Sequence, residues 1–100
     1  MAAAADCKAD FALKCKGDSM IGARIYDGDL VFIKEQPQVE NGEIAAVVIG
    51  DEATLKRVYC QKDMITLVAA NPAYEPMVFS GSELDGILIL GKEVFFVGKL

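Results

Sequence analysis

Histidine is absent from this chain of 100 residues. Neither a Ser-His-Asp triad nor a histidine-containing metal site is therefore possible. Basic residues are also scarce, with Lys+Arg 10 against Asp+Glu 15 and a net charge of −5. Because phosphate contacts need clustered cations, a chain this acidic is a poor candidate for binding nucleic acid by itself.

Cysteines are few and long apolar runs are missing. The three cysteines, Cys7, Cys15 and Cys60, show no Cys-x-x-Cys spacing, which argues against a disulfide framework and a structural metal site. Charges interrupt every hydrophobic stretch before it is long enough to span a bilayer. The opening residues 1–5 lack the basic and apolar regions of a signal peptide. We therefore predict a cytoplasmic protein with no metal, no other cofactor and no membrane contact.

The chain is nevertheless rich in apolar residues, which make up 53% of it, against 25% charged residues. This balance excludes a disordered chain, and the length allows one domain with one core. Hydrophobicity this high in a small chain also hints at apolar surface shared with a partner subunit. We expect residues 1–10 to be a linker stub or a remnant of cloning and residues 11–100 to form the domain.

Turn signals divide the chain into short strands. Apolar alternation and apolar runs predict strands over 11–16, 30–34, 43–49, 53–60, 64–69, 87–90 and 94–97. The Val- and Ile-rich run over 43–49 indicates a strand that is covered on both faces. Short helical turns are predicted only near 19–23 and 82–85. A loop begins at Asn71-Pro72 and is extended by Pro76, and Gly91-Lys92-Glu93 separates the last two strands. The pattern is typical of a compact, mostly antiparallel β fold with partly closed edges.

A serine and a lysine remain as candidate catalytic residues, because a neutral lysine can activate a serine. Ser19 follows Gly17-Asp18 on a predicted turn, where its hydroxyl would be exposed and backbone N–H groups could hold an oxyanion. Lys56 lies in the strand predicted over 53–60, where strand alternation places it on one face with Thr54 and Val58. Burial there would lower its pKa. Taken alone, this spacing is weak evidence, since a capping serine and a solvated lysine are more common.

Four motifs that follow one another along the chain support this assignment through their resemblance to a known family, although each motif alone would be weak evidence. They are Gly17-Asp18-Ser19-Met20, Ile25-Tyr26-Asp27-Gly28-Asp29-Leu30-Val31, Asn41-Gly42-Glu43-Ile44-Ala45 and Leu55-Lys56-Arg57-Val58. Together with the separation of 37 positions between Ser19 and Lys56, they resemble the C-terminal peptidase domain of the LexA and phage CI-type repressors. The resemblance runs from about Phe11 to Leu100. It includes an Asn…Tyr…Pro loop at Asn71, Tyr74 and Pro76.

The resemblance implies a fold and a chemistry for residues 11–100, the Ser-Lys peptidase and dimerisation domain. Ser19 would be the nucleophile and Lys56 the general base. The backbone N–H groups of Ser19 and Met20 would form the oxyanion hole. Met20 could also shape the substrate cleft, although ordinary packing explains a methionine there equally well. Asp18, Asp27 and Asp29 are predicted to form turns rather than to act as catalytic acids.

The resemblance also implies a biological context. Family members cut an Ala-Gly-type bond in their own chain during the DNA-damage (SOS) response, when a RecA-type filament on single-stranded DNA activates them. We therefore expect part of a LexA-like or prophage transcriptional repressor. It would form a homodimer and reach DNA only through an N-terminal domain that this chain lacks. One of the adjacent residues Phe95 and Phe96 would be in the core and the other in the subunit interface.

Two departures from the family pattern leave alternatives open. The chain has no helix-turn-helix segment and no Ala-Gly pair before Phe11. It could be an isolated domain, a post-cleavage fragment or a short family member that cuts another chain, so self-cleavage of this chain is in doubt. The alternative functions are a non-catalytic dimerisation module of a phage repressor and a signal-peptidase-type Ser-Lys protease.

Overall fold

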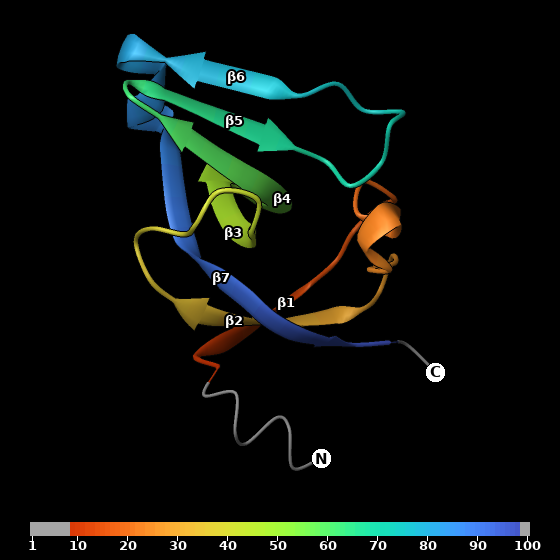
Figure 1. Ribbon diagram of the computed structural model, residues 1–100. Helices are drawn as coiled ribbons and strands as arrows, with labels where there is room; N and C mark the ends of the chain where they lie inside the picture. Colours follow the sequence, from red (N-terminus) through yellow and green to blue (C-terminus); the bar gives the residue numbers. More distant parts are fainter. Residues whose placement is uncertain (1–8, 99–100) are drawn as a thin grey trace.

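Seven strands form one sheet in the part of the chain that the computed structural model describes, residues 9–98 (Figure 1). Every neighbouring pair of strands is antiparallel. With η marking a 3-10 helix, the elements are β1 (Phe11–Lys14), η1 (Ile21–Ala23), β2 (Leu30–Glu35), β3 (Ile44–Ile49), β4 (Glu52–Gln61), β5 (Met64–Val68), β6 (Met77–Ser80), η2 (Gly81–Gly86) and β7 (Ile87–Val97). The prediction of a mostly antiparallel β fold is confirmed.

The long strand β7 belongs to both halves of the sheet. Its first part pairs with β3 and its last part pairs with β2, and the register shifts once in each pairing because β7 has one extra residue there, Leu90 opposite β3 and Val94 opposite β2. Such bulges bend a strand and increase its twist. In Figure 1, β1 and β2 accordingly lie below while β4, β5 and β6 lie above. The strand order β1-β2-β7-β3-β4-β5-β6 leaves β1 and β6 at the two edges, so the sheet is not closed.

The two strands predicted over 87–90 and 94–97 are in fact one continuous strand, β7. Gly91 was interpreted as part of a turn between them, but it lies inside the strand. A Cβ atom at this position would come within 2.2 Å of the carbonyl oxygen of Lys34. Gly91 therefore allows two strands to approach closely at the bend, which is another common use of glycine within a strand.

The second difference from the sequence-based expectation is β6, which lies where the loop after Asn71 was expected to continue. Its four residues follow Pro76 directly, and they pair with β5 alone at the edge of the sheet. A strand this short, directly after a proline, carries too little alternation to be recognised. The helical turn predicted near 82–85 is confirmed as η2.

Two apolar clusters pack against opposite faces of β3. Ala46 belongs to the first cluster, together with Met20, Ile25 and other residues of the N-terminal segment. Val47 belongs to the second cluster, together with Leu67 of β5 and further residues of β4 and β7. The Val- and Ile-rich run is therefore covered on both faces, as predicted. The first cluster fixes the segment that follows β1 against the sheet.

The predicted linker over 1–10 lies outside the described residues except for its last two positions. Asp10 is already tied to β2, since its N–H donates to the Ile33 carbonyl at 2.8 Å and its carboxylate accepts the Glu35 N–H at 2.7 Å. Within residues 9–98, no helix has the length and apolar character needed to cross a membrane.

Candidate active site

Ser19 lies on the turn that connects β1 to η1. The carbonyl of Asp29 holds the start of this turn by accepting the Cys15 N–H at 2.8 Å. Gly17 then adopts a φ of +81°, and its N–H donates to the Asp27 carboxylate at 2.8 Å. Glycine tolerates this left-handed conformation, which reverses the chain just before the serine. Asp27 and Asp29 themselves belong to the turn at Gly28, as predicted, since the Asp29 N–H donates to the Tyr26 carbonyl at 3.0 Å.

The structure brings Lys56 of β4 to Ser19. The Nζ atom of Lys56 lies 3.3 Å from Oγ of Ser19, 2.9 Å from Oγ1 of Thr54 and 3.0 Å from the carbonyl oxygen of Leu55. A neutral amine has two N–H donors and one lone pair. If Thr54 and the Leu55 carbonyl accept the two N–H bonds, the lone pair is left for the serine hydroxyl. This is the arrangement that a general base requires.

Burial favours the neutral form of the Lys56 amine. Only 9% of Lys56 is exposed to solvent. Desolvation lowers the pKa of Lys56 below its ordinary value, and this effect outweighs the opposite effects of Cys15 and Glu52. Among the described residues, Lys56 forms no salt bridge that would hold it in the charged form. The site therefore favours a lysine that accepts a proton.

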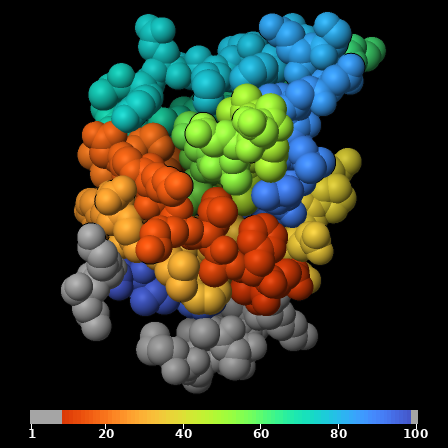
Figure 2. Space-filling view, turned by 180° about the vertical axis from the view of Figure 1, so that it is seen from behind, coloured from red at the N-terminus to blue at the C-terminus, as the bar shows by residue number. Residues whose placement is uncertain are grey.

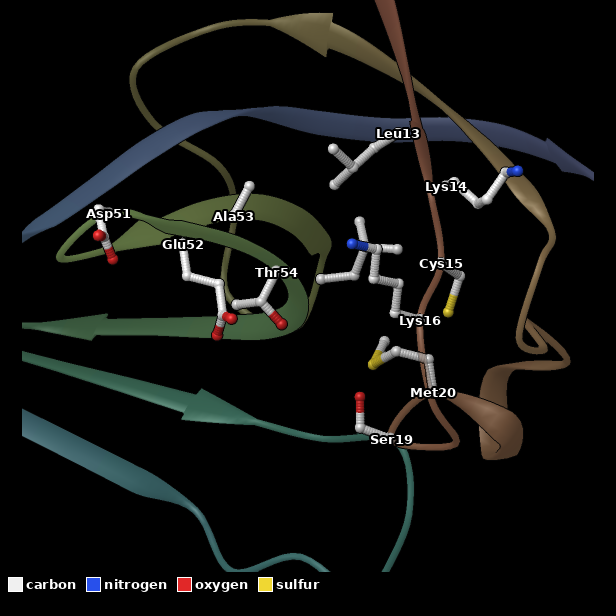
Figure 3. A pocket seen from close by; sticks show the side chains of 11 residues that line it. Leu13, Lys14, Cys15, Lys16, Ser19, Met20, Asp51, Glu52, Ala53 and Thr54 are labelled. Atoms are coloured by element: carbon white, nitrogen blue, oxygen red, sulfur yellow. The ribbon is translucent and has the colours of Figure 1, made fainter.

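Ser19 opens into a cavity of about 500 Å³ between the end of β1 and the β3–β4 hairpin. Figure 3 shows its hydroxyl pointing into this cavity, with Cys15 and Met20 on one side and Thr54 on the other. Met20 both lines the cavity and is fully buried in the first apolar cluster, so it serves the cleft and the core together. The cavity is large enough for a few residues of an extended peptide beside the serine.

The backbone N–H groups of Ser19 and Met20, which the sequence analysis assigned to an oxyanion hole, have no acceptor within residues 9–98. None of the hydrogen bonds found within residues 9–98 uses either of these N–H groups as its donor. The carbonyl of Met20 is occupied instead, since it accepts the N–H of Ala23 at 3.0 Å. Two free donors next to the hydroxyl are what a tetrahedral oxyanion needs.

Thr54 and Asn71 are the residues whose roles the sequence analysis missed. Strand alternation already placed Thr54 on the face of Lys56, but it did not indicate a hydrogen bond to the amine. Asn71 was noted only as part of the Asn…Tyr…Pro loop, and its side-chain amide donates to the carbonyl of Asp18 at 2.8 Å. In the same loop, the Tyr74 hydroxyl donates to the Asp18 carboxylate at 2.5 Å, and this carboxylate raises the pKa of Tyr74. Asp18 itself lies in the turn between β1 and η1, as predicted.

The described residues offer no donor set for a metal. Within residues 9–98, no three His, Cys, Asp or Glu side chains are grouped so that they could hold an ion. Cys15 and Cys60 are free thiols, and Cys7 lies outside the described residues. Burial, and then the charges of Asp29 and Asp27, raise the pKa of the Cys15 thiol, which lines the cavity.

Known proteins match this chain over most of its length. Residues 3–94 match the Peptidase S24-like family. The chain belongs to this family. Its match covers Ser19, Lys56 and the loop that holds Asp18, so the whole candidate site lies within the family's domain. The resemblance to the LexA-type peptidase domain is therefore confirmed, and the match supports a serine peptidase.

Similar relatives of this S24-like chain are named LexA repressor. The protein of Myxococcus xanthus is 43% identical over 90 residues, which are 90% of this chain and 40% of the relative. The protein of Citrifermentans bemidjiense is 43% identical over 84 residues, 84% of this chain and 41% of the relative. That of Clostridium tetani is 44% identical over 79 residues, 79% of this chain and 40% of the relative. The chain thus spans about two fifths of the length of these relatives.

Proposed function

We propose that this chain is the autopeptidase and dimerisation domain of a LexA-like repressor, and that it cuts a peptide bond with a dyad of Ser19 and Lys56. The observation that carries the proposal is the buried Nζ of Lys56, 3.3 Å from the hydroxyl oxygen of Ser19. The family match and the relatives named LexA repressor support the repressor context.

The proposed reaction follows from the hydrogen-bond partners of the dyad. Neutral Lys56 takes the proton of the Ser19 hydroxyl as Oγ forms a bond to the scissile carbonyl carbon. The N–H groups of Ser19 and Met20 hold the oxyanion. Lys56 then passes its proton to the leaving amine, and the C–N bond breaks. Water attacks the acyl-enzyme by the same route and frees Ser19.

The biological part of the proposal rests on the resemblance. The scissile bond would be of the Ala-Gly type in a segment before the peptidase domain, and a RecA-type filament formed after DNA damage would trigger the SOS cleavage. The repressor would be a homodimer that contacts DNA through a separate N-terminal domain. The relatives are more than twice as long as this chain, which leaves room for such a domain.

Two other functions fit parts of the sequence. A non-catalytic dimerisation module has no need of a Ser-Lys contact, and a distance of 3.3 Å between Nζ and Oγ favours catalysis over that alternative. A signal-peptidase-type protease would share the dyad. The match to the S24-like family and to repressors favours the repressor domain over it.

Cleavage of a peptide in trans tests the proposal. The chain is incubated at neutral and alkaline pH with a peptide that carries an Ala-Gly bond in an apolar context, and the same segment is fused ahead of Met1 as a second substrate. We expect cleavage that Ser19→Ala and Lys56→Ala each reduce by about a thousandfold or more. Ser82→Ala and Lys34→Ala, which change exposed residues outside the cavity, are the matched controls. A folded wild type that cuts neither substrate would contradict the proposed peptidase.

A further inference from the structure

The loop between β5 and β6 is packed against the turn that carries the serine. Figure 2 shows the two segments side by side, the turn in orange and the loop in teal above it. The N–H of Gly22 donates to the Ala70 carbonyl at 2.6 Å. A Cβ atom on Gly22 would lie only 2.5 Å from that carbonyl oxygen. The loop thus follows the turn too closely for any larger residue at this position.

Asn71 is the side chain of this loop that reaches the turn from a buried position. It is 9% exposed, and its Nδ2 lies 2.8 Å from the carbonyl oxygen of Asp18. Its Oδ1 accepts the N–H of Ala73 at 2.9 Å. Rotating the amide by half a turn would place an NH₂ group against an N–H and an oxygen against a carbonyl. Both ends of the amide therefore fix its orientation, with the donor towards Asp18.

The carbonyl of Asp18 belongs to the same peptide unit as the N–H of Ser19. The described residues contain no cis peptide bond, so in this planar unit the C=O and the N–H point in opposite directions. Holding the Asp18 carbonyl towards the loop consequently holds the Ser19 N–H away from it. That N–H is one of the two donors without a partner in the protein.

We propose that Asn71 is a positioning residue of the oxyanion hole, which aims the Ser19 N–H by hydrogen bonding the carbonyl of the same peptide unit. The inference rests on the proposed Ser-Lys peptidase and adds to it the group that orients one of its oxyanion donors. A donor that is oriented before the reaction needs no reorganisation as charge develops on the substrate oxygen. Without Asn71, the remaining hydrogen bond of the Asp18–Ser19 peptide unit within residues 9–98 is the longer one from the Ile21 N–H to its carbonyl, at 3.4 Å, while Tyr74 still binds the Asp18 side chain.

The test compares two asparagines that undergo the same chemical change. Asn71→Asp keeps the shape and the acceptor for Ala73 but removes the donor to Asp18. Asn41→Asp is the matched control, because Asn41 likewise donates to a backbone carbonyl, that of Cys60 at 3.4 Å, and accepts the Cys60 N–H at 2.8 Å. Asn71→Ala removes the donor without adding a charge and serves as the second variant.

We expect both Asn71 variants to lower kcat for the Ala-Gly peptide by about a hundredfold, as the loss of an oxyanion donor does. KM should stay within about twofold, because the substrate binds before the oxyanion forms. The midpoint of the pH–rate profile should not move in Asn71→Ala, since Lys56 is untouched. The affinity of a peptide aldehyde, whose adduct carries the oxyanion, should fall in parallel with kcat. Asn41→Asp should leave all four quantities unchanged.

The outcomes separate this inference from the proposed function. Asn71 variants that cut at the wild-type rate would overturn the positioning role, and so would a loss confined to KM, a displaced pH midpoint in Asn71→Ala or a loss of the fold in both variants. If the wild type does not cut, the peptidase proposal fails instead. The positioning role is then decided by the ¹H–¹⁵N spectrum, in which the Ser19 amide must shift in Asn71→Ala and stay in place in Asn41→Asp.

Discussion

At the scale of single residues, the charge state of one lysine sets the chemistry. Burial lowers the pKa of Lys56, whereas a free lysine has a pKa of about 10.4. A larger fraction of Lys56 is thus neutral at any pH below that value. The first prediction is a cleavage rate that rises as pH increases, because the neutral base becomes more abundant, with a midpoint below the pKa of about 10.4 of a free lysine. Single-turnover rates across neutral and alkaline pH measure it.

The pH–rate profile can also contradict the role of Lys56 as the base. A rate that does not change between neutral and strongly alkaline pH would exclude Lys56 as the base. The unfolding of the chain must be followed over the same pH range by circular dichroism, so that a fall in rate caused by loss of structure is recognised.

A second prediction concerns Thr54, whose hydroxyl lies 2.9 Å from Nζ of Lys56. Thr54→Val keeps the shape of the side chain and removes this hydrogen bond, so the amine loses one of the two acceptors that orient its lone pair. We expect kcat to fall by about tenfold, and the pH midpoint to move lower because the charged amine loses an acceptor. Thr66→Val on β5, which lies outside the cavity, is the control. An unchanged kcat in Thr54→Val would show that Ser19 and the Leu55 carbonyl suffice to orient the amine.

The roles of these residues show how much of the candidate site could be predicted from the sequence. The motifs pointed to Ser19 and Lys56, and strand alternation placed Thr54 on the correct face. The bond between Asn71 and Asp18 joins residues 53 positions apart, and no local pattern carries information about such a contact. The catalytic roles of Ser19, Lys56 and Met20 stay predictions until cleavage is measured.

At the scale of elements, β7 decides how the two halves of the sheet meet. Gly91 sits where β7 passes β2, and a methyl group there would meet the Lys34 carbonyl. The third prediction is that Gly91→Ala lowers the free energy of unfolding by about 3 kcal/mol, because the neighbouring backbone must move to relieve the overlap. Gly86→Ala, next to the start of β7 and with no atom near the added methyl, is the control. Urea unfolding of both variants gives the comparison, and equal stability would contradict the close approach.

The strands also show where sequence patterns fail to predict the structure. Strands with long apolar or alternating runs, such as β3 and β4, were predicted to within a few residues. The glycine in β7 was misinterpreted because a close approach between strands and a turn both call for glycine. A local pattern cannot separate the two, since the neighbour that requires the glycine, Lys34, is far away in the sequence.

At the scale of the whole molecule, the bent sheet assembles the site from three separate segments. The turn after β1 brings Ser19, β4 brings Lys56, and the loop before β6 brings Asn71. The motifs indicated that Ser19 and Lys56 belong together. The distance between them, however, depends on how β7 bends between the two halves of the sheet. A change in this bend would therefore disturb the dyad without touching either of its residues.

The outer face of β2 and β7 is the surface on which we expect two copies to pair. Phe96 packs against the first core cluster, whereas Phe95 stacks on Phe32 with ring centroids 4.4 Å apart. Leu30 and Val97 pair beside this stack and are 39% and 43% exposed. The two phenylalanines thus serve opposite faces, as predicted, and the outer face is apolar enough for a symmetric interface.

The fourth prediction tests that interface by adding a charge to it. Val97→Glu places a carboxylate in the proposed dimer contact, where it would lose its hydration without gaining a partner, so the dimer should dissociate at least about tenfold more readily. Leu88→Glu, on the same strand and 59% exposed but away from the stack, should leave the association unchanged. Sedimentation equilibrium over a range of concentrations measures both variants. A wild type that is monomeric at every concentration, or a Leu88→Glu variant that dissociates while Val97→Glu does not, would exclude pairing through the outer face of β2 and β7.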